Sequence, residues 1–172
     1  MTPVRKATFA CLSFAGIGLF GWFTTGVENV ASVPLLVYYA VLLINTFFSI
    51  RIFSAITPKS FVQTLFDRVA AVFYLALAFS FGSVPTFAAV SAGLFLLAVA
   101  KYVHLKGLVP SSALLPRKIV LNTLAALLSL FALALTLLGF SEAAAWVLCI
   151  IFALANIYLL IFNPMYRIER SR

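Results

Sequence analysis

The stretches RIFSAITPKSFVQTLFDR (51–68) and KYVHLKGLVPSSALLPRK (101–118) decide how this chain folds. Each is basic, and each separates two apolar stretches of about twenty residues, the length that crosses a bilayer as a helix. The three other breaks, VENVAS (27–32), GSVP (82–85) and GFSE (139–142), are short and contain neither Lys nor Arg. Basic and non-basic breaks therefore alternate along the chain.

This alternation predicts a topology. All twelve Lys and Arg residues lie in the two basic stretches or near the two termini. Because basic loops stay in the cytoplasm, the pattern indicates six spans with both ends inside. We expect an all-α polytopic membrane protein, a six-transmembrane-helix bundle of three tandem hairpins, forming a single transmembrane domain over residues 1–172. The predicted spans are residues 5–25, 33–56, 61–81, 85–105, 116–138 and 142–163.

The composition agrees with a membrane protein and excludes a soluble domain. Hydrophobic residues make up 65% of the chain and charged residues 9%, and the mean hydropathy is +1.17. A soluble domain of this composition could not cover itself with polar surface. The net charge of +8 is explained by loops that face anionic headgroups on the cytoplasmic side, so we expect the lipid bilayer and not nucleic acid as partner. The expected location is the cytoplasmic (inner) membrane of a bacterium.

The N-terminal apolar stretch could be read as a signal peptide. Residues 1–25 combine early basic residues with an apolar run. The stretch lacks a convincing small-x-small cleavage site and leads directly into another span, so we expect a retained first helix.

Small residues recur at helical spacing in the predicted span 116–138. Ala125, Ser129, Ala132 and Thr136 follow Asn122 at steps of three and four, with leucines on the other faces. Helices in lipid associate through close backbone approach and interhelical hydrogen bonds, so this row predicts a packing face. Shorter rows of the same kind are Ala7, Cys11 and Ala15, and Ala145, Cys149 and Ala153. The two cysteines read as small packing residues.

Polar residues inside spans are the candidates for function, because each is costly in hydrocarbon. Asn45, Lys101, His104, Asn122 and Asn156 are all expected between the midplane and the cytoplasmic interface. We therefore predict that they line one cytoplasm-facing pocket, with Asn45 deepest and Lys101 supplying charge. Two alternatives stay open: cations near helix ends extend to the headgroups, and membrane asparagines often serve only as hydrogen bonds between helices.

The sequence lacks the acidic residues and histidines that a proton relay or a metal site would need. The four acids are Glu28, Asp67, Glu142 and Glu169, and none is expected mid-span. A proton relay normally uses intramembrane acids or histidines, and the single histidine excludes a His-cluster metal site. We expect neither a cofactor nor a metal.

Three functions remain. The first is a small-solute transport or channel component that takes an anionic or neutral polar ligand. The second is a non-catalytic accessory, structural or inhibitor-type subunit, in a homo-oligomer or a larger membrane complex. The third, a lipid-modifying membrane enzyme, would need an unforeseen arrangement around His104, Asp67 and Ser60. A polar cavity at the three asparagines would favour the first, and direct bonds to neighbouring helices with no cavity would favour the second.

The topology can be tested by labelling single cysteines. Cysteine substituted at Asn29, Ser83 or Ser141 is expected to react with a membrane-impermeant thiol reagent from outside the cell, because these breaks carry no basic residue. Labelling of the Ser83 position from the cytoplasmic side would contradict the six-span arrangement.

Overall fold

The computed structural model describes residues 2–58, 60–109 and 114–163, and within these ranges the regular structure is entirely helical. The helices are α1 (Pro3–Thr25), α2 (Ser32–Ile56), α3 (Phe61–Ala78), α4 (Val84–Leu108), α5 (Leu114–Leu137) and α6 (Ser141–Ile157), which continues as a short π-helical segment, η1 (Tyr158–Phe162). Counting Ser141–Phe162 as one, these six described helices are all long and apolar enough to cross a membrane. Each predicted span end lies within three residues of a helix end.

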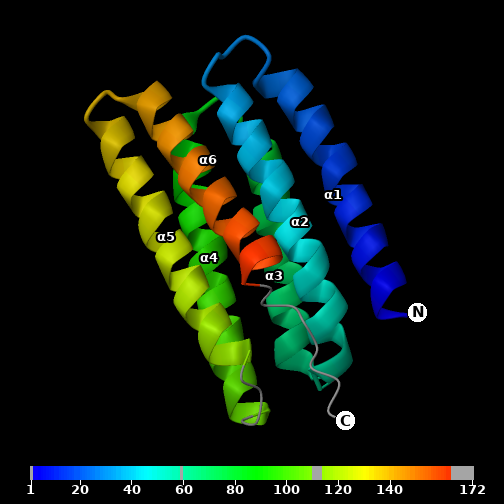
Figure 1. Cartoon of the computed structure of the whole chain (residues 1–172). Coiled ribbons are helices and arrows are strands. Elements are labelled where there is room, and N and C mark those ends of the chain that lie inside the picture. Colours follow the sequence, from blue (N-terminus) through cyan, green and yellow to red (C-terminus); the bar gives the residue numbers. More distant parts are fainter. Residues whose placement is uncertain (1, 59, 110–113, 164–172) are drawn as a thin grey trace.

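The six helices form a bundle around a shared core (Figure 1). Going round the bundle, α1, α2, α6, α5, α4 and α3 each pack against the next, and α3 packs against α1. Across the middle, α4 also contacts α2 and α6. The segment between α4 and α5 is only partly described, and these two helices make the most extensive contact in the bundle.

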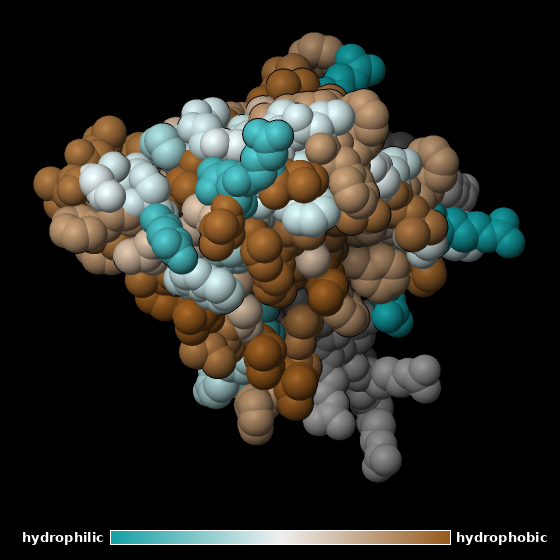
Figure 2. All heavy atoms as spheres, turned by 90° about the horizontal axis from the view of Figure 1, so that it is seen from above, coloured by the Kyte–Doolittle hydropathy of each residue, from teal (hydrophilic) through white to brown (hydrophobic). Residues whose placement is uncertain are grey.

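The two ends of the bundle differ in character. The turns after α1, α3 and α5 lie together at the upper end of Figure 1, here called the turn end. Figure 2 looks onto this end and shows a few hydrophilic residues among neutral and apolar ones. The opposite end, here called the basic end, carries the described basic residues: Arg5, Lys6, Arg51, Arg68, Lys101, Lys106, Arg117 and Lys118.

Local chemistry explains the helix boundaries. The Ser83 side chain caps α4, and Pro85 occupies the first turn, where its missing N–H costs nothing. At the end of α5, Gly139 has φ +89°, and the N–H groups of Gly139 and Phe140 donate to Thr136 and Leu135. This is a Schellman motif, which needs a left-handed residue and therefore favours glycine.

At the starts of α6 and α3 the sequence favours caps that the structure does not form in full. Ser141, which could have capped α6, is its first helical residue, and Phe140 holds the cap position without a side-chain bond. The pair Ser60 and Gln63 predicts a reciprocal capping box, but only half of it forms. The Ser60 hydroxyl accepts from the Gln63 N–H at 3.1 Å, while the Gln63 side chain does not return to Ser60.

The small residues of α5 face the other helices. Asn122, Ser129, Ala132 and Thr136 are buried, and Ala125 is half-buried. The exposed positions of α5 include Leu124, Leu127, Leu130, Phe131 and Leu137. Apolar side chains therefore cover the outer face, and the small groups allow α5 to approach its neighbours.

A buried chain of hydroxyl groups joins three helices through this face. Tyr38 of α2 and Ser91 of α4 have hydroxyl oxygens 2.6 Å apart, and Ser91 lies 3.0 Å from Ser129 of α5. Thr46 of α2 and Tyr74 of α3 form a second hydroxyl pair. Each such bond contributes roughly 0.6 kcal/mol in membrane proteins, so together they fix the register of the central helices.

Helices α1 and α3 approach through a glycine. At Gly21 a Cβ atom would overlap the backbone carbonyl of Ala78, whereas at Gly16 it would meet nothing within 4 Å. Only hydrogen on the Gly21 Cα allows this contact.

Alanine substitution separates these two glycines. Gly21→Ala is expected to destabilise the fold by about 1–3 kcal/mol, because backbone must move to admit the methyl group. Gly16→Ala, the matched control on the same helix, is expected to be neutral or stabilising by up to about 1 kcal/mol, since alanine favours the helix. Reversible unfolding in mixed micelles measures both, and equal effects would show that α1 and α3 do not make this close contact.

Candidate functional site

The most unusual residue of the bundle is Lys118. It is 3% exposed, although it lies near the start of α5, where the basic stretch 101–118 overlaps the predicted span 116–138. Its Nζ donates to the Ser49 hydroxyl at 2.8 Å and to Asn45 Oδ1 at 3.2 Å, both on α2. An ammonium group buried within a membrane helix bundle is costly, and such residues are usually functional.

The sequence held a signal that would have found Lys118. It lies four residues before Asn122, on the same face of α5 as the row of small residues. Extending that row by one helical turn places Lys118 toward the protein interior. The prediction began this row at Asn122 and treated Lys118 only as one of the basic residues that mark the cytoplasmic side.

Two of the three asparagines bond to Lys118, and the third, Asn156 of α6, lines a pocket together with it. Asn45 accepts a hydrogen bond from Lys118. The Asn122 side-chain amide donates to the Lys118 backbone carbonyl at 2.7 Å, and the Asn156 amide donates to the Phe152 carbonyl at 2.8 Å. The last two donors are thus satisfied within their own helices, and both side chains are buried.

Lys118, Asn45 and Asn122 form a polar cluster, and two hollows meet there. The larger, here called the cleft, has a volume of about 680 Å³ and is lined by residues of α1, α2, α3, α4 and α5. The smaller, here called the side pocket, has about 340 Å³ and is lined mainly by α5, α6 and η1. Asn45, Phe95, Lys118 and Asn122 border both. The polar cluster therefore forms part of the wall between the cleft and the side pocket.

The cleft reaches the basic end of the bundle. Pro3 and Lys6 at the start of α1 and Thr57 and Pro58 after α2 are among its lining residues. Cavities of this size accept small organic ligands.

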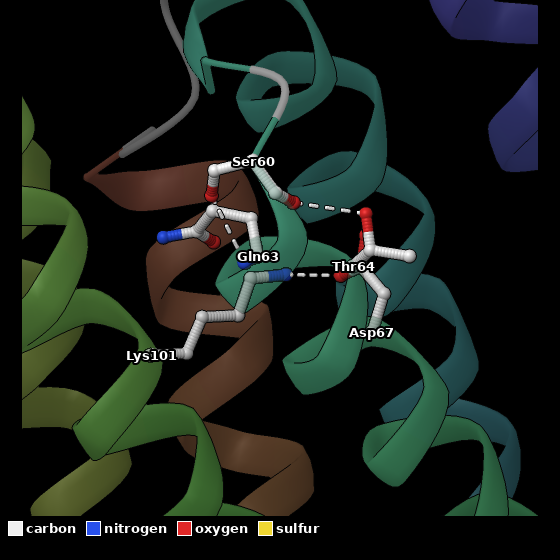
Figure 3. Close-up of polar contacts among 5 residues, drawn as sticks. All are labelled: Ser60, Gln63, Thr64, Asp67 and Lys101. Carbon is white, nitrogen blue, oxygen red and sulfur yellow. Dashed lines mark hydrogen bonds and ion pairs between the residues drawn. The ribbon is translucent and has the colours of Figure 1, made fainter.

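An ion pair lies at the same end of the cleft (Figure 3). Lys101 of α4 donates to Asp67 of α3 at 2.6 Å, with side-chain exposures of 22% and 51%. Both residues line the cleft. Because the pair is partly exposed, it contributes little to stability, of the order of 0–1 kcal/mol. Its main effect is to neutralise charge at the cleft entrance.

Four of the five predicted ligand-binding residues border these hollows. Asn45 and Asn122 border both, Lys101 borders the cleft, and Asn156 borders the side pocket. His104 borders neither. It is exposed on α4, with its ring centroid 6.1 Å from that of Phe66. The inward face of α4 at this level is formed by Tyr102 and Leu105, both buried, and His104 is turned away from it.

Within the described ranges, no group of three or more His, Cys, Asp or Glu residues could hold a metal ion. No family model matches the chain, and neither a curated protein nor a solved structure is significantly similar to it.

Proposed function

We propose that this protein is a small-solute transport or channel component of a bacterial inner membrane. In this proposal the six helices cross the bilayer as three tandem hairpins, both termini are cytoplasmic, and the basic end faces the cytoplasm. The cleft is then a polar pocket that opens to the cytoplasm. The observation that carries the proposal is the buried Lys118, bonded to Asn45 and Ser49 in the wall of the cleft.

The groups around Lys118 favour a ligand rich in acceptor oxygens. An ammonium group attracts carboxylate, phosphate or carbonyl oxygen, and the attraction strengthens where water is scarce. Asn45 and Asn122 add amide groups to the same wall, and amides fix the orientation of a ligand more than its charge. An anionic or neutral polar solute fits this wall.

The accessory-subunit function remains the second candidate, supported by a specific observation. The amides of Asn122 and Asn156 are bonded within their own helices, so neither depends on a ligand. An apolar outer surface also suits a partner helix in a homo-oligomer or larger complex.

Thiol labelling tests the proposed pocket without knowledge of the ligand. The protein is prepared without Cys11 and Cys149, and Ser49→Cys places a thiol beside Lys118. In inverted membrane vesicles, anionic 2-sulfonatoethyl methanethiosulfonate is expected to react about tenfold faster than its cationic trimethylammonium analogue, because the ammonium group steers anions into the cleft. Lys118→Met is expected to abolish this preference.

Two controls make the result specific. Lys106→Met removes an exposed charge of α4, also at the basic end of the bundle, and is expected to leave the preference for the anionic reagent intact. A cysteine at Ile44, which is exposed on the outer surface of α2, is expected to react slowly with both reagents in the bilayer. If the Ser49 position reacts only from the opposite face, or no faster than the Ile44 position, the protein has no cytoplasm-facing pocket and the accessory function becomes the better account.

A further inference from the structure

The Gln63 side chain lines the cleft and makes no hydrogen bond to any described residue. It is 3% exposed, and among the described residues neither its Nε2 nor its Oε1 has a hydrogen-bond partner. A buried polar group without a partner is unfavourable, and such groups are rare in folded proteins. This one lines the cleft.

A local partner is available to Gln63 and is not used. Ser60 is the N-cap of α3. In a complete capping box, its backbone N–H donates a hydrogen bond to the side-chain oxygen of the glutamine three residues later. The Ser60 hydroxyl already accepts from the Gln63 backbone, and Thr64 donates to the Ser60 carbonyl at 3.0 Å. In Figure 3 the Gln63 amide points away from Thr64 and Asp67. Gln63 therefore lines the cleft without completing the cap.

A second unsatisfied group borders the same cavity. The Ser54 hydroxyl oxygen is buried and has no partner among the described residues, and Ser54 also lines the cleft. The two groups come from α2 and α3, on either side of the connection at the basic end. The wall of one cavity therefore contains two buried polar groups without a partner among the described residues.

We propose that Gln63 and Ser54 form a subsite for an uncharged group that carries a hydrogen-bond donor beside an acceptor, such as a primary carboxamide or a urea. A glutamine amide offers one carbonyl and one NH₂, so its complement is a group of the same kind in reverse order. The neighbouring Lys101–Asp67 pair neutralises itself and so does not demand a charged ligand.

The rest of the cleft defines the body of the ligand. Phe14, Leu42, Phe53 and Phe95 supply apolar and aromatic surface to the same cavity. A carboxamide attached to a small apolar or aromatic body matches this combination, since ligand pockets pair an apolar lining with a few polar groups that fix orientation. This inference rests on the proposed function only in that both require a cleft that is open to solutes.

Three probes of nearly equal shape test the subsite. Binding of benzamide, acetophenone and benzoate to the full-length protein in detergent is measured by titration calorimetry. Benzamide has donor and acceptor, acetophenone lacks the donor, and benzoate is charged. Benzamide is expected to bind about tenfold tighter than acetophenone, because the latter leaves polar groups of the site unpaired. Benzoate, whose carboxylate is attracted to Lys118 in the same cleft, is expected to bind equally well whether or not the Gln63 amide is present.

The near-isosteric variant Gln63→Met separates a ligand-binding role from a structural one. It is expected to lose the preference for benzamide and, without ligand, to raise the melting temperature, because an unpaired buried amide has been removed. Thr123→Val is the control. Thr123 is exposed on α5 and bonded to its own helix. Neither the preference for benzamide nor the melting temperature is therefore expected to change.

Each other outcome overturns the subsite. Equal binding of benzamide and acetophenone would mean that the cleft holds only water at Gln63. A lower melting temperature for Gln63→Met would show that the side chain supports the fold. Absence of any benzamide binding, with anion-selective labelling at the Ser49 position retained, would refute the subsite while leaving the proposed function in place.

Discussion

Lipid offers helices no hydrophobic reason to associate, and this constraint governs the whole structure. Association must come from close packing and from polar groups that find partners inside the bundle. The small face of α5, the glycine contact of α1 with α3 and the hydroxyl chain Tyr38–Ser91–Ser129 all meet that requirement. Large apolar side chains are left to cover the outside, as the exposed leucines of α5 show.

The polar groups of the interior fall into two sets under this constraint. Toward the turn end, hydroxyls pair with hydroxyls across helices, and no cavity is needed to explain them. Toward the basic end, Lys118 is buried in a cavity wall and Gln63 has an amide without a partner among the described residues. The first set stabilises the bundle. The second set is costly to the fold, and in our account a ligand compensates for that cost.

The six helices and their bounds were predictable because apolar length and loop charge are properties of consecutive residues. The face of α5 was predictable because its spacing is helical. The candidate site was only partly predictable from the sequence. Asn45 and Asn122 were found by their intramembrane position, but Lys118, in the first turn of the predicted span 116–138, was counted only among the basic residues of the cytoplasmic side. His104 shares a turn with Lys101 yet faces outward. Gln63 forms only half of the capping box that its spacing from Ser60 predicts.

The division of polar groups into two sets is the central claim, and the free energy of unfolding of two variants in bicelles tests it directly. Ser91→Ala breaks the hydroxyl chain and is predicted to destabilise the bundle by about 1 kcal/mol. Lys118→Met is predicted to leave the stability unchanged or higher, because removal of a buried ammonium group offsets the loss of its hydrogen bonds. A larger loss of stability for Lys118→Met than for Ser91→Ala would contradict the account, since Lys118 would then hold the fold together.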